Sequence, residues 1–186
     1  MPVRAEPTAI PGCTLVHLDR HADARGDFVK GFAASAYAAM GCDPTVAEVY
    51  WSTSRRATIR GMHFQVPPHA HAKTVCVVRG SVHDVVIDLR VASPAFRRHV
   101  TVPLNAARPA ALHVPLGCAH GFQALEDDTL VAYLVGTEHD PGADTGVRWD
   151  SIGVDWPLPD PIVSERDAAF VALDDFASPF TGPVPA

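Results

Sequence analysis

The sequence predicts an all-β domain of the jelly-roll kind, and three observations support this class. Short runs that alternate apolar and polar residues follow one another over residues 46–135, a period that is typical of half-buried β-strands. Turn-forming residues separate these runs, for example at residues 79–81 and 115–117. A helical pattern is confined to residues 35–41 and a possible helix start at Ser164. Many short strands with almost no helix indicate an antiparallel sandwich or barrel whose closure hides the strand edges.

The chain begins and ends with segments that carry no strand or helix pattern. Residues 1–12 and 177–186 are expected to be loose termini of a single domain that spans residues 1–186. Between them, strands are expected at residues 14–18, 25–30, 46–51, 58–65, 74–78, 82–89, 98–104, 110–114, 121–125 and 129–135. The acidic residues 126–128 predict a hairpin turn between the last two of these strands. The Ala-rich helix at residues 35–41 ends at a glycine, which is a common helix stop.

Composition excludes several classes of protein. A chain of 186 residues with a net charge of −6 and scattered lysines and arginines offers no basic face for nucleic acid. No apolar run approaches the roughly 18 residues that would span a bilayer, so we expect no membrane partner and a cytoplasmic location. The four cysteines are widely spaced and form no C-x-x-C pair, which predicts reduced thiols rather than a zinc or redox site.

The stretch from Arg60 to Lys73 is the most informative part of the chain. It places two cations and three histidines around Pro67-Pro68, which breaks any helix and favours extended geometry before it. On a strand, His63 shares a face with Gly61 and Gln65, where no large apolar side chain competes. The alternative is a surface hairpin whose polar residues only solvate a turn.

A second motif favours a jelly roll of the cupin type. Pro115-x-Gly117-x-x-His120 matches the second cupin motif, in which the histidine points into the barrel. His69-Ala70-His71 offers the H-x-H of the first motif, but Lys73 stands where a glutamate ligand is needed. Since an ammonium group repels a divalent ion, we expect no metal and no other cofactor, and we interpret the two histidines as loop residues.

The remaining polar residues suit removal of a proton from a carbon next to a carbonyl group. His63 can accept a proton near neutral pH, Lys73 can stabilise an oxyanion, and Tyr133 can donate a proton from another direction. Asp167 could orient the histidine. Each has a structural alternative, since Tyr133 could be a core aromatic, Lys73 a rim charge and Asp167 a helix N-terminal carboxylate.

With these residues assembled, the sequence resembles the dTDP-4-dehydrorhamnose 3,5-epimerase family over residues 14–176. The resemblance rests on ordered motifs, which are Arg60-Gly61-Met62-His63-Phe64-Gln65, Pro67-Pro68, Lys73, residues 80–90 with Ser93-Pro94, Ala119-His120-Gly121-Phe122, Tyr133, Trp156-Pro157 and Ser164-x-x-Asp167. It implies a metal-free, homodimeric cupin jelly roll that epimerises a 4-keto-6-deoxy sugar carried on a nucleoside diphosphate.

The resemblance also implies roles for single residues. His63 would be the base with Asp167 as its partner, Tyr133 the acid on the other sugar face, and Lys73 the group facing the 4-keto oxygen. Arg60 and His120 would line the sugar and diphosphate, and Arg25 and Phe28 would belong to the nucleotide site. The full set of expected substrate-binding residues is Arg60, His120, Gln65, Arg25, Phe28, Lys30, Glu48 and His139.

Five positions depart from the usual residues of that family, and they lie near the expected nucleotide. The family usually has glutamate where this chain has Lys30, glutamine at Glu48, asparagine at Tyr50, glutamine at His71 and tyrosine at His139. A site built to hydrogen-bond one partner rejects another that lacks the matching group. We therefore hypothesise that the proton-transfer residues are retained while the accepted nucleotide, or the sugar, has changed.

Two other functions remain open at the level of sequence. One is a ketoisomerase or dehydratase that uses the same enolate, and the other is a cupin that binds a sugar nucleotide without turnover. A pure binding protein has no need of both a base and an acid, which argues against the second. The sequence does not decide whether C3, C5 or both carbons are inverted.

Overall fold

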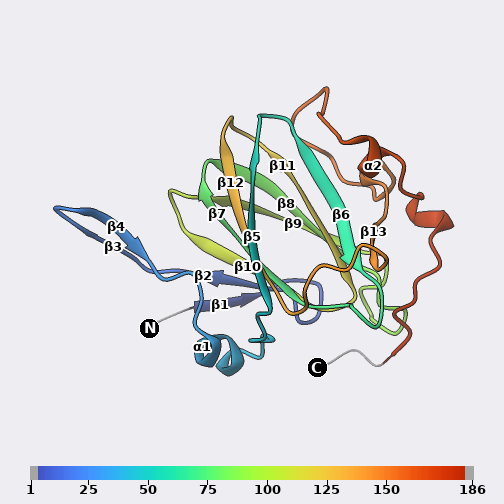
Figure 1. The fold of residues 1–186 in the computed structure, drawn as a ribbon, viewed down its shortest axis with the longest axis horizontal. Coiled ribbons are helices and arrows are strands. Elements are labelled where there is room, and N and C mark those ends of the chain that lie inside the picture. Colours follow the sequence, from blue (N-terminus) through green and yellow to red (C-terminus); the bar gives the residue numbers. More distant parts are fainter. Residues whose placement is uncertain (1–3, 183–186) are drawn as a thin grey trace.

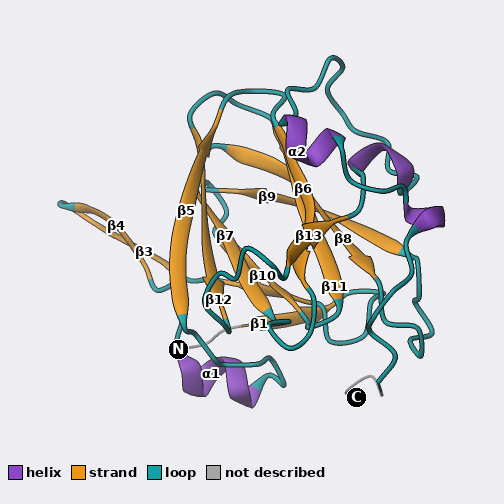
Figure 2. Ribbon diagram, turned by 45° about the vertical axis from the view of Figure 1, so that its right-hand side comes forward, coloured by secondary structure: helices purple, strands orange, loops and turns teal. Residues whose placement is uncertain are grey.

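Two antiparallel sheets face each other and form most of the molecule in the computed structural model, which describes residues 4–182 (Figure 1, Figure 2). The first sheet has the strand order β1 (Arg4–Pro7), β2 (Thr14–His17), β10 (Ala110–Val114), β7 (Lys73–Arg79), β12 (Thr129–Val135) and β5 (Glu48–Ser54). The second has the order β13 (Asp144–Gly146), β6 (Ile59–Gln65), β11 (Cys118–Ala124), β8 (Ser81–Asp88) and β9 (His99–Asn105). The all-β prediction is confirmed.

Successive strands alternate between the two sheets, which is the jelly-roll arrangement. From β5 to β8 each strand lies in the sheet opposite to its predecessor, and the same holds from β9 to β13. The faces that the two sheets turn towards each other are buried, and apolar residues at alternate positions of the strands lie on them. Central strands such as β11 are buried on both faces, because further segments cover the outside of the sheet. Because the connections cross between sheets, residues far apart in the chain become neighbours inside the barrel.

A separate hairpin and four short helical segments complete the fold over residues 4–182. The hairpin, β3 (Arg20–Asp23) and β4 (Gly26–Val29), projects away from the barrel (Figure 1). The helical segments are α1 (Ala34–Ala39), η1 (Trp149–Ser151), α2 (Glu165–Ala168) and η2 (Leu173–Asp175). Within the described residues, no helix has the length and apolar character needed to cross a membrane.

The apolar core of the described part of the chain consists of three clusters. The largest fills the space between the sheets and includes Val75, Val86 and Phe122, each almost fully buried. A second, around Met62 and Leu89, lies under the C-terminal segment. A third packs α1 against the outer face of the first sheet. Full burial of one such large side chain stabilises the fold by about 1.5–3 kcal/mol.

Both expected loose termini are ordered where the structure describes them. Arg4–Pro7 forms β1 and pairs with β2, and Ile10 is buried. Near the other end, Phe180 is buried, and its ring lies edge-on to Phe64 at 5.8 Å between centroids. The four residues of β1 are all exposed, so they carry no apolar alternation by which the sequence could have predicted a strand. The expected loose residues 1–3 and 183–186 lie outside the described residues.

The acidic segment at residues 126–128 was wrongly predicted as a hairpin turn. It connects β11 to β12, and these strands lie in opposite sheets. Turn-forming residues mark a change of chain direction but do not identify which strand pairs with which. The short strands β3 and β13 were also absent from the predicted set, since each is brief and lacks a buried apolar face.

Candidate active site

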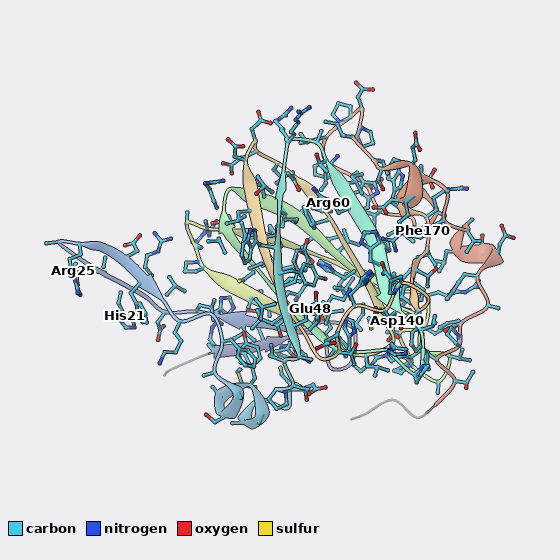
Figure 3. All side chains as sticks on the ribbon, viewed as in Figure 1. His21, Arg25, Glu48, Arg60, Asp140 and Phe170 are labelled. Atoms are coloured by element: carbon cyan, nitrogen blue, oxygen red, sulfur yellow. The ribbon has the colours of Figure 1, made fainter. Side chains whose placement is uncertain are left out.

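A cavity of about 330 Å³ opens on the side of the barrel where an edge strand of each sheet comes close. Edge strand β5 contributes from the first sheet, and β6 with the outer strand β13 contributes from the second. Figure 3 shows Glu48, Asp140 and Phe170 around this side of the molecule. The lining residues are Glu48, Tyr50, His63, Phe64, Gln65, His71, Lys73, Val135, Thr137, His139, Asp144 and Arg166.

His63 and Asp167 form a hydrogen-bonded pair at this cavity. His63 Nε2 lies 2.8 Å from Asp167 Oδ1, and Asp167 Oδ2 accepts the N–H of Gly61 at 3.1 Å. Burial alone would raise the pKa of Asp167, but its hydrogen bonds, above all with His63, hold that pKa below the ordinary value. An ionised Asp167 requires Nε2 to carry the proton, which leaves Nδ1 of His63 as the acceptor.

Local structure explains how Asp167 reaches a histidine 104 positions earlier in the chain. Ser164 caps α2, and its hydroxyl accepts the N–H of Asp167 at 3.1 Å. The cap fixes the first turn of the helix and points the carboxylate at β6. The ring of Phe170 then lies edge-on to the imidazole at 5.8 Å between centroids and packs beside the pair.

Lys73 is a buried cation at the same cavity. It begins β7, its exposed fraction is 7%, and its Nζ donates to the carbonyl oxygen of His63 at 3.1 Å. Burial lowers the pKa of Lys73 to about 8, against the opposing effect of Asp144 and Asp84. Near neutral pH the group is therefore an ammonium ion, and it reaches from β7 to the backbone of β6 in the opposite sheet, next to His63.

Tyr133 lies one strand further from the open side. Its exposed fraction is 7%, and its hydroxyl is 3.2 Å from Ser52 Oγ. The ring of Tyr50 stacks on it at 4.7 Å between centroids, and His120 approaches its edge at 6.3 Å. Burial raises the pKa of Tyr133 well above its ordinary value, so the phenol keeps its proton throughout the neutral range.

Three of the predicted binding residues line the cavity. Gln65 joins two loops, because its side chain donates to the carbonyl of His69 in the β6–β7 loop at 3.0 Å and accepts the N–H of Asp140 in the loop after β12 at 2.7 Å. Glu48 Oε2 accepts the N–H of His139 at 2.7 Å. This hydrogen bond joins edge strand β5 to the loop after β12. Glu48 and His139 are two of the five positions at which the chain differs from the usual residues of the family that it resembles.

The other predicted binding residues do not line this cavity. His120 is buried behind Tyr133, with Nε2 3.0 Å from both carboxylate oxygens of Asp84. Arg60 bonds Ser54 Oγ at 3.0 Å and lines a neighbouring cavity together with Asp167. Arg25, Phe28 and Lys30 lie on or next to the projecting hairpin, as the position of Arg25 in Figure 3 shows.

Several lining residues were not predicted as site residues. Tyr50 and His71 were noted only as departures from the family pattern, and Asp144 and Arg166 carried no signal at all. Arg166 Nη2 lies 2.7 Å from Asp144 Oδ2, so this ion pair joins α2 to β13 at the cavity. His71 Nδ1 is 2.7 Å from Thr137 Oγ1, and burial lowers the pKa of His71 to about 4. The imidazole of His71 is therefore neutral.

The histidines at the cavity do not assemble into a metal site. Across residues 4–182, no group of three or more His, Cys, Asp or Glu side chains has the arrangement needed to hold an ion. Instead, His63 can act as a base, the carboxylate of Asp167 lies behind it, and the ammonium of Lys73 lies beside it. Such a set can remove a proton from a carbon acid and stabilise the resulting oxyanion.

Comparison with known proteins gives one consistent result. A family model described as dTDP-4-dehydrorhamnose 3,5-epimerase matches residues 7–175. The dTDP-4-dehydrorhamnose 3,5-epimerase of Streptomyces griseus is 38% identical over 165 residues, which cover 87% of this chain and 82% of that protein. The dTDP-4-dehydrorhamnose 3-epimerase of Streptomyces niveus is 34% identical, covering 89% and 81%.

Comparison with solved structures leads to the same family of epimerases. The Legionella pneumophila dTDP-6-deoxy-D-glucose-3,5-epimerase, determined in complex with dTDP-4-keto-L-rhamnose, superposes with a TM-score of 0.91 at 27% identity. The match covers 99% of this chain and 100% of that one. The expected fold, a cupin jelly roll, is confirmed by this agreement over the whole barrel.

Proposed function

The chain belongs to the dTDP-4-dehydrorhamnose 3,5-epimerase family, and from this we propose that it inverts C3, C5 or both of a nucleoside-diphosphate-linked 4-keto-6-deoxy sugar. The observation that carries the proposal is the single cavity in which His63, backed by Asp167, lies beside the buried ammonium of Lys73. The reaction is an isomerisation that proceeds through an enolate.

In the first half of the reaction, His63 acts as the base. Its Nδ1 takes the proton from the carbon next to the 4-keto group, and the C–H electrons move to form the enolate, whose charge rests on O4. Asp167 holds the imidazole and stabilises the positive charge that it gains. Lys73 offsets the negative charge on the enolate oxygen from a site that excludes most water.

In the second half, Tyr133 returns a proton to the opposite face of the same carbon. The configuration is thereby inverted, and no atom is gained or lost overall. The raised pKa of Tyr133 keeps the phenol protonated until a basic enolate carbon comes within reach. The resulting tyrosinate and imidazolium then recover their original protonation states by exchange with solvent.

Exchange with heavy water tests the proposed reaction. The protein is incubated in D₂O with a nucleoside-diphosphate 4-keto-6-deoxyglucose, and deuterium is located by NMR. We expect label at C3, at C5 or at both, together with a change in configuration. Binding without any label would contradict the proposal and would favour a cupin that binds sugar nucleotides without turnover.

We also propose a homodimer in which the β3–β4 hairpin of one copy reaches the cavity of the second. The hairpin carries Arg25 and Phe28 away from its own barrel (Figure 1, Figure 3), and Phe28 is 60% exposed. Among the described strands, β5 pairs only with β12, and its outward side chains Val49 and Trp51 are 57% and 70% exposed. A long apolar edge of this kind is normally covered by another chain.

Complementation between two inactive variants tests this arrangement. One chain carries His63→Ala, and the other carries Arg25→Ala with Phe28→Ala. After co-expression, a hairpin that acts in the second copy leaves one intact site in each mixed dimer, so roughly one quarter of all sites should be active. Each variant alone should be nearly inactive. If the hairpin served its own barrel, or if the chain were a monomer, the mixture would be as inactive as its components.

The nucleotide accepted by the site is proposed to differ from dTDP. Glu48 replaces a glutamine, and a carboxylate accepts hydrogen bonds but cannot donate them. It therefore suits a base with an exocyclic amino group, such as cytosine or guanine, better than thymine, whose one N–H donor lies between two carbonyl oxygens that a carboxylate cannot bond. His139, bonded to Glu48 through its backbone N–H, replaces a larger stacking tyrosine.

Isothermal titration with dTDP, UDP, CDP and GDP checks the nucleotide preference. We expect CDP or GDP to bind about tenfold or more tightly than dTDP, which corresponds to one hydrogen bond to a charged group. Glu48→Gln restores a side chain that both donates and accepts, and it should move the preference towards dTDP. A clear preference of the wild-type chain for dTDP would disprove the altered specificity.

A further inference from the structure

Tyr50 occupies the position between Tyr133 and the open side of the barrel. Its strand, β5, is the edge strand of its sheet, and Tyr133 lies on the next strand inward, β12. The two residues are directly opposite each other in the strand register. Their rings are stacked, with centroids 4.7 Å apart and planes 16° from parallel. Tyr50 lines the cavity, whereas Tyr133 does not.

This stack restricts where the Tyr133 hydroxyl can go. Stacked rings at 4.7 Å are in van der Waals contact, so no sugar ring can enter between them. On its far side, His120 approaches the ring edge of Tyr133 and is itself held by Asp84. The hydroxyl also bonds Ser52, which lies two residues after Tyr50 on the same strand face. Tyr133 is therefore enclosed by Tyr50, Ser52 and His120, which restrict the movement of its ring.

The effect of Tyr50 is steric rather than ionic. Burial, together with Glu48 and Asp144, raises the pKa of Tyr50 to about 12. Its phenol is thus neutral at any pH at which the site works, and it adds no charge near the enolate. What the side chain contributes is the volume of an aromatic ring beside the proton donor.

The two carbons that could be inverted, C3 and C5, flank the keto carbon C4. If one base and one acid are to serve both, the sugar must turn so that C5 takes the place previously held by C3. Such a turn needs free space next to the acid. We propose that Tyr50 is a positioning residue that confines Tyr133 and limits inversion to one of these two carbons. This inference rests on the proposed epimerase function and goes beyond it by assigning its regiochemistry to one side chain.

Deuterium labelling of the wild-type chain and three variants tests the inference. The variants are Tyr50→Ala and Tyr50→Asn, which remove the ring, and Tyr50→Phe, which keeps it. We expect the wild type to label one carbon at least about tenfold faster than the other, equivalent to some 1.4 kcal/mol in activation free energy. Tyr50→Phe should keep this ratio, because it keeps the stack. Tyr50→Ala and Tyr50→Asn should bring the two rates to within a few-fold of each other.

Three results would overturn the inference. The first is a wild type that labels C3 and C5 equally fast. The second is an unchanged ratio in both ring-removing variants. The third is loss of inversion with exchange retained in Tyr50→Phe, since Tyr50 would then be the proton donor itself. Absence of label in the wild type is a different result, because it contradicts the epimerase function and this inference with it. A general structural effect of losing the ring would slow both carbons alike and leave the ratio unchanged.

Discussion

Replacing His63 with alanine should lower the rate of solvent exchange by about 10²–10⁴-fold, the usual contribution of a positioned general base. The imidazole is the only cavity group that is backed by a buried carboxylate among the described residues, through the 2.8 Å contact with Asp167. Its removal leaves the ammonium of Lys73 in place but no acceptor for the proton. The rate is measured as deuterium incorporated per unit time at saturating substrate.

A matched control separates the base from a general effect of removing a histidine. His99 lies on β9, away from the cavity, and His99→Ala should exchange at the wild-type rate. Nucleotide binding by the His63→Ala chain should also persist, since the lost group acts on the sugar. If His63→Ala kept the wild-type exchange rate, the base would have to be another group.

Lys73→Met should lower the exchange rate by about 10²–10³-fold, the effect of removing one donor to a developing oxyanion. Methionine has a similar length and suits a site where the lysine is only 7% exposed. The wild-type rate should also fall as pH rises through about 8, because the ammonium then loses its proton. Lys73→Met lacks this group and should show no such fall. The measurement is the pH profile of exchange for both chains, with Arg79→Met on the exposed end of β7 as a control.

The stability of Lys73→Met provides an independent check. Burial depresses the pKa of Lys73 below its unfolded value, so between about pH 8 and 10.5 the unfolded chain binds more protons than the folded one. The free energy of unfolding should therefore rise with pH across this window in the wild type, and the rise should be smaller in the variant. Below pH 8 the variant should be no less stable, which would attribute its lost activity to chemistry rather than to unfolding. A variant that unfolds more easily at pH 7 would argue against a strained, buried ammonium.

Most of the strands were predictable, because their residues alternate with the two faces of a sheet. The predicted runs at residues 74–78, 82–89 and 129–135 correspond to β7, β8 and β12 within one or two residues. What the sequence could not provide is the pairing of strands. A short polar segment such as β1 becomes a strand only because β2 offers it a partner. For the same reason, residues 126–128, which connect strands in opposite sheets, were predicted as a hairpin turn.

The candidate site was also predictable in part, because local patterns place single residues on a strand or a helix but do not show which strands pair. His63 was placed on an open face by the period of its strand, and Ser164 marked the helix that carries Asp167. The stack of Tyr50 on Tyr133 depends on the register of β5 against β12, which local patterns do not contain. Arg25 and Phe28 were predicted to belong to the nucleotide site, and that remains a prediction; local patterns could not show that their hairpin projects away from the barrel of its own chain.

The stereochemical outcome of Tyr133→Phe in heavy water tests most directly whether the proton leaves one face of the sugar and returns to the other. We expect deuterium to enter the reacting carbon while its configuration is retained, because His63 can still remove a proton and return a deuteron to the same face. The product is analysed by NMR for label and configuration in the same sample. Inversion at the wild-type rate in Tyr133→Phe, or a complete loss of exchange, would contradict the division of roles between the imidazole and the phenol.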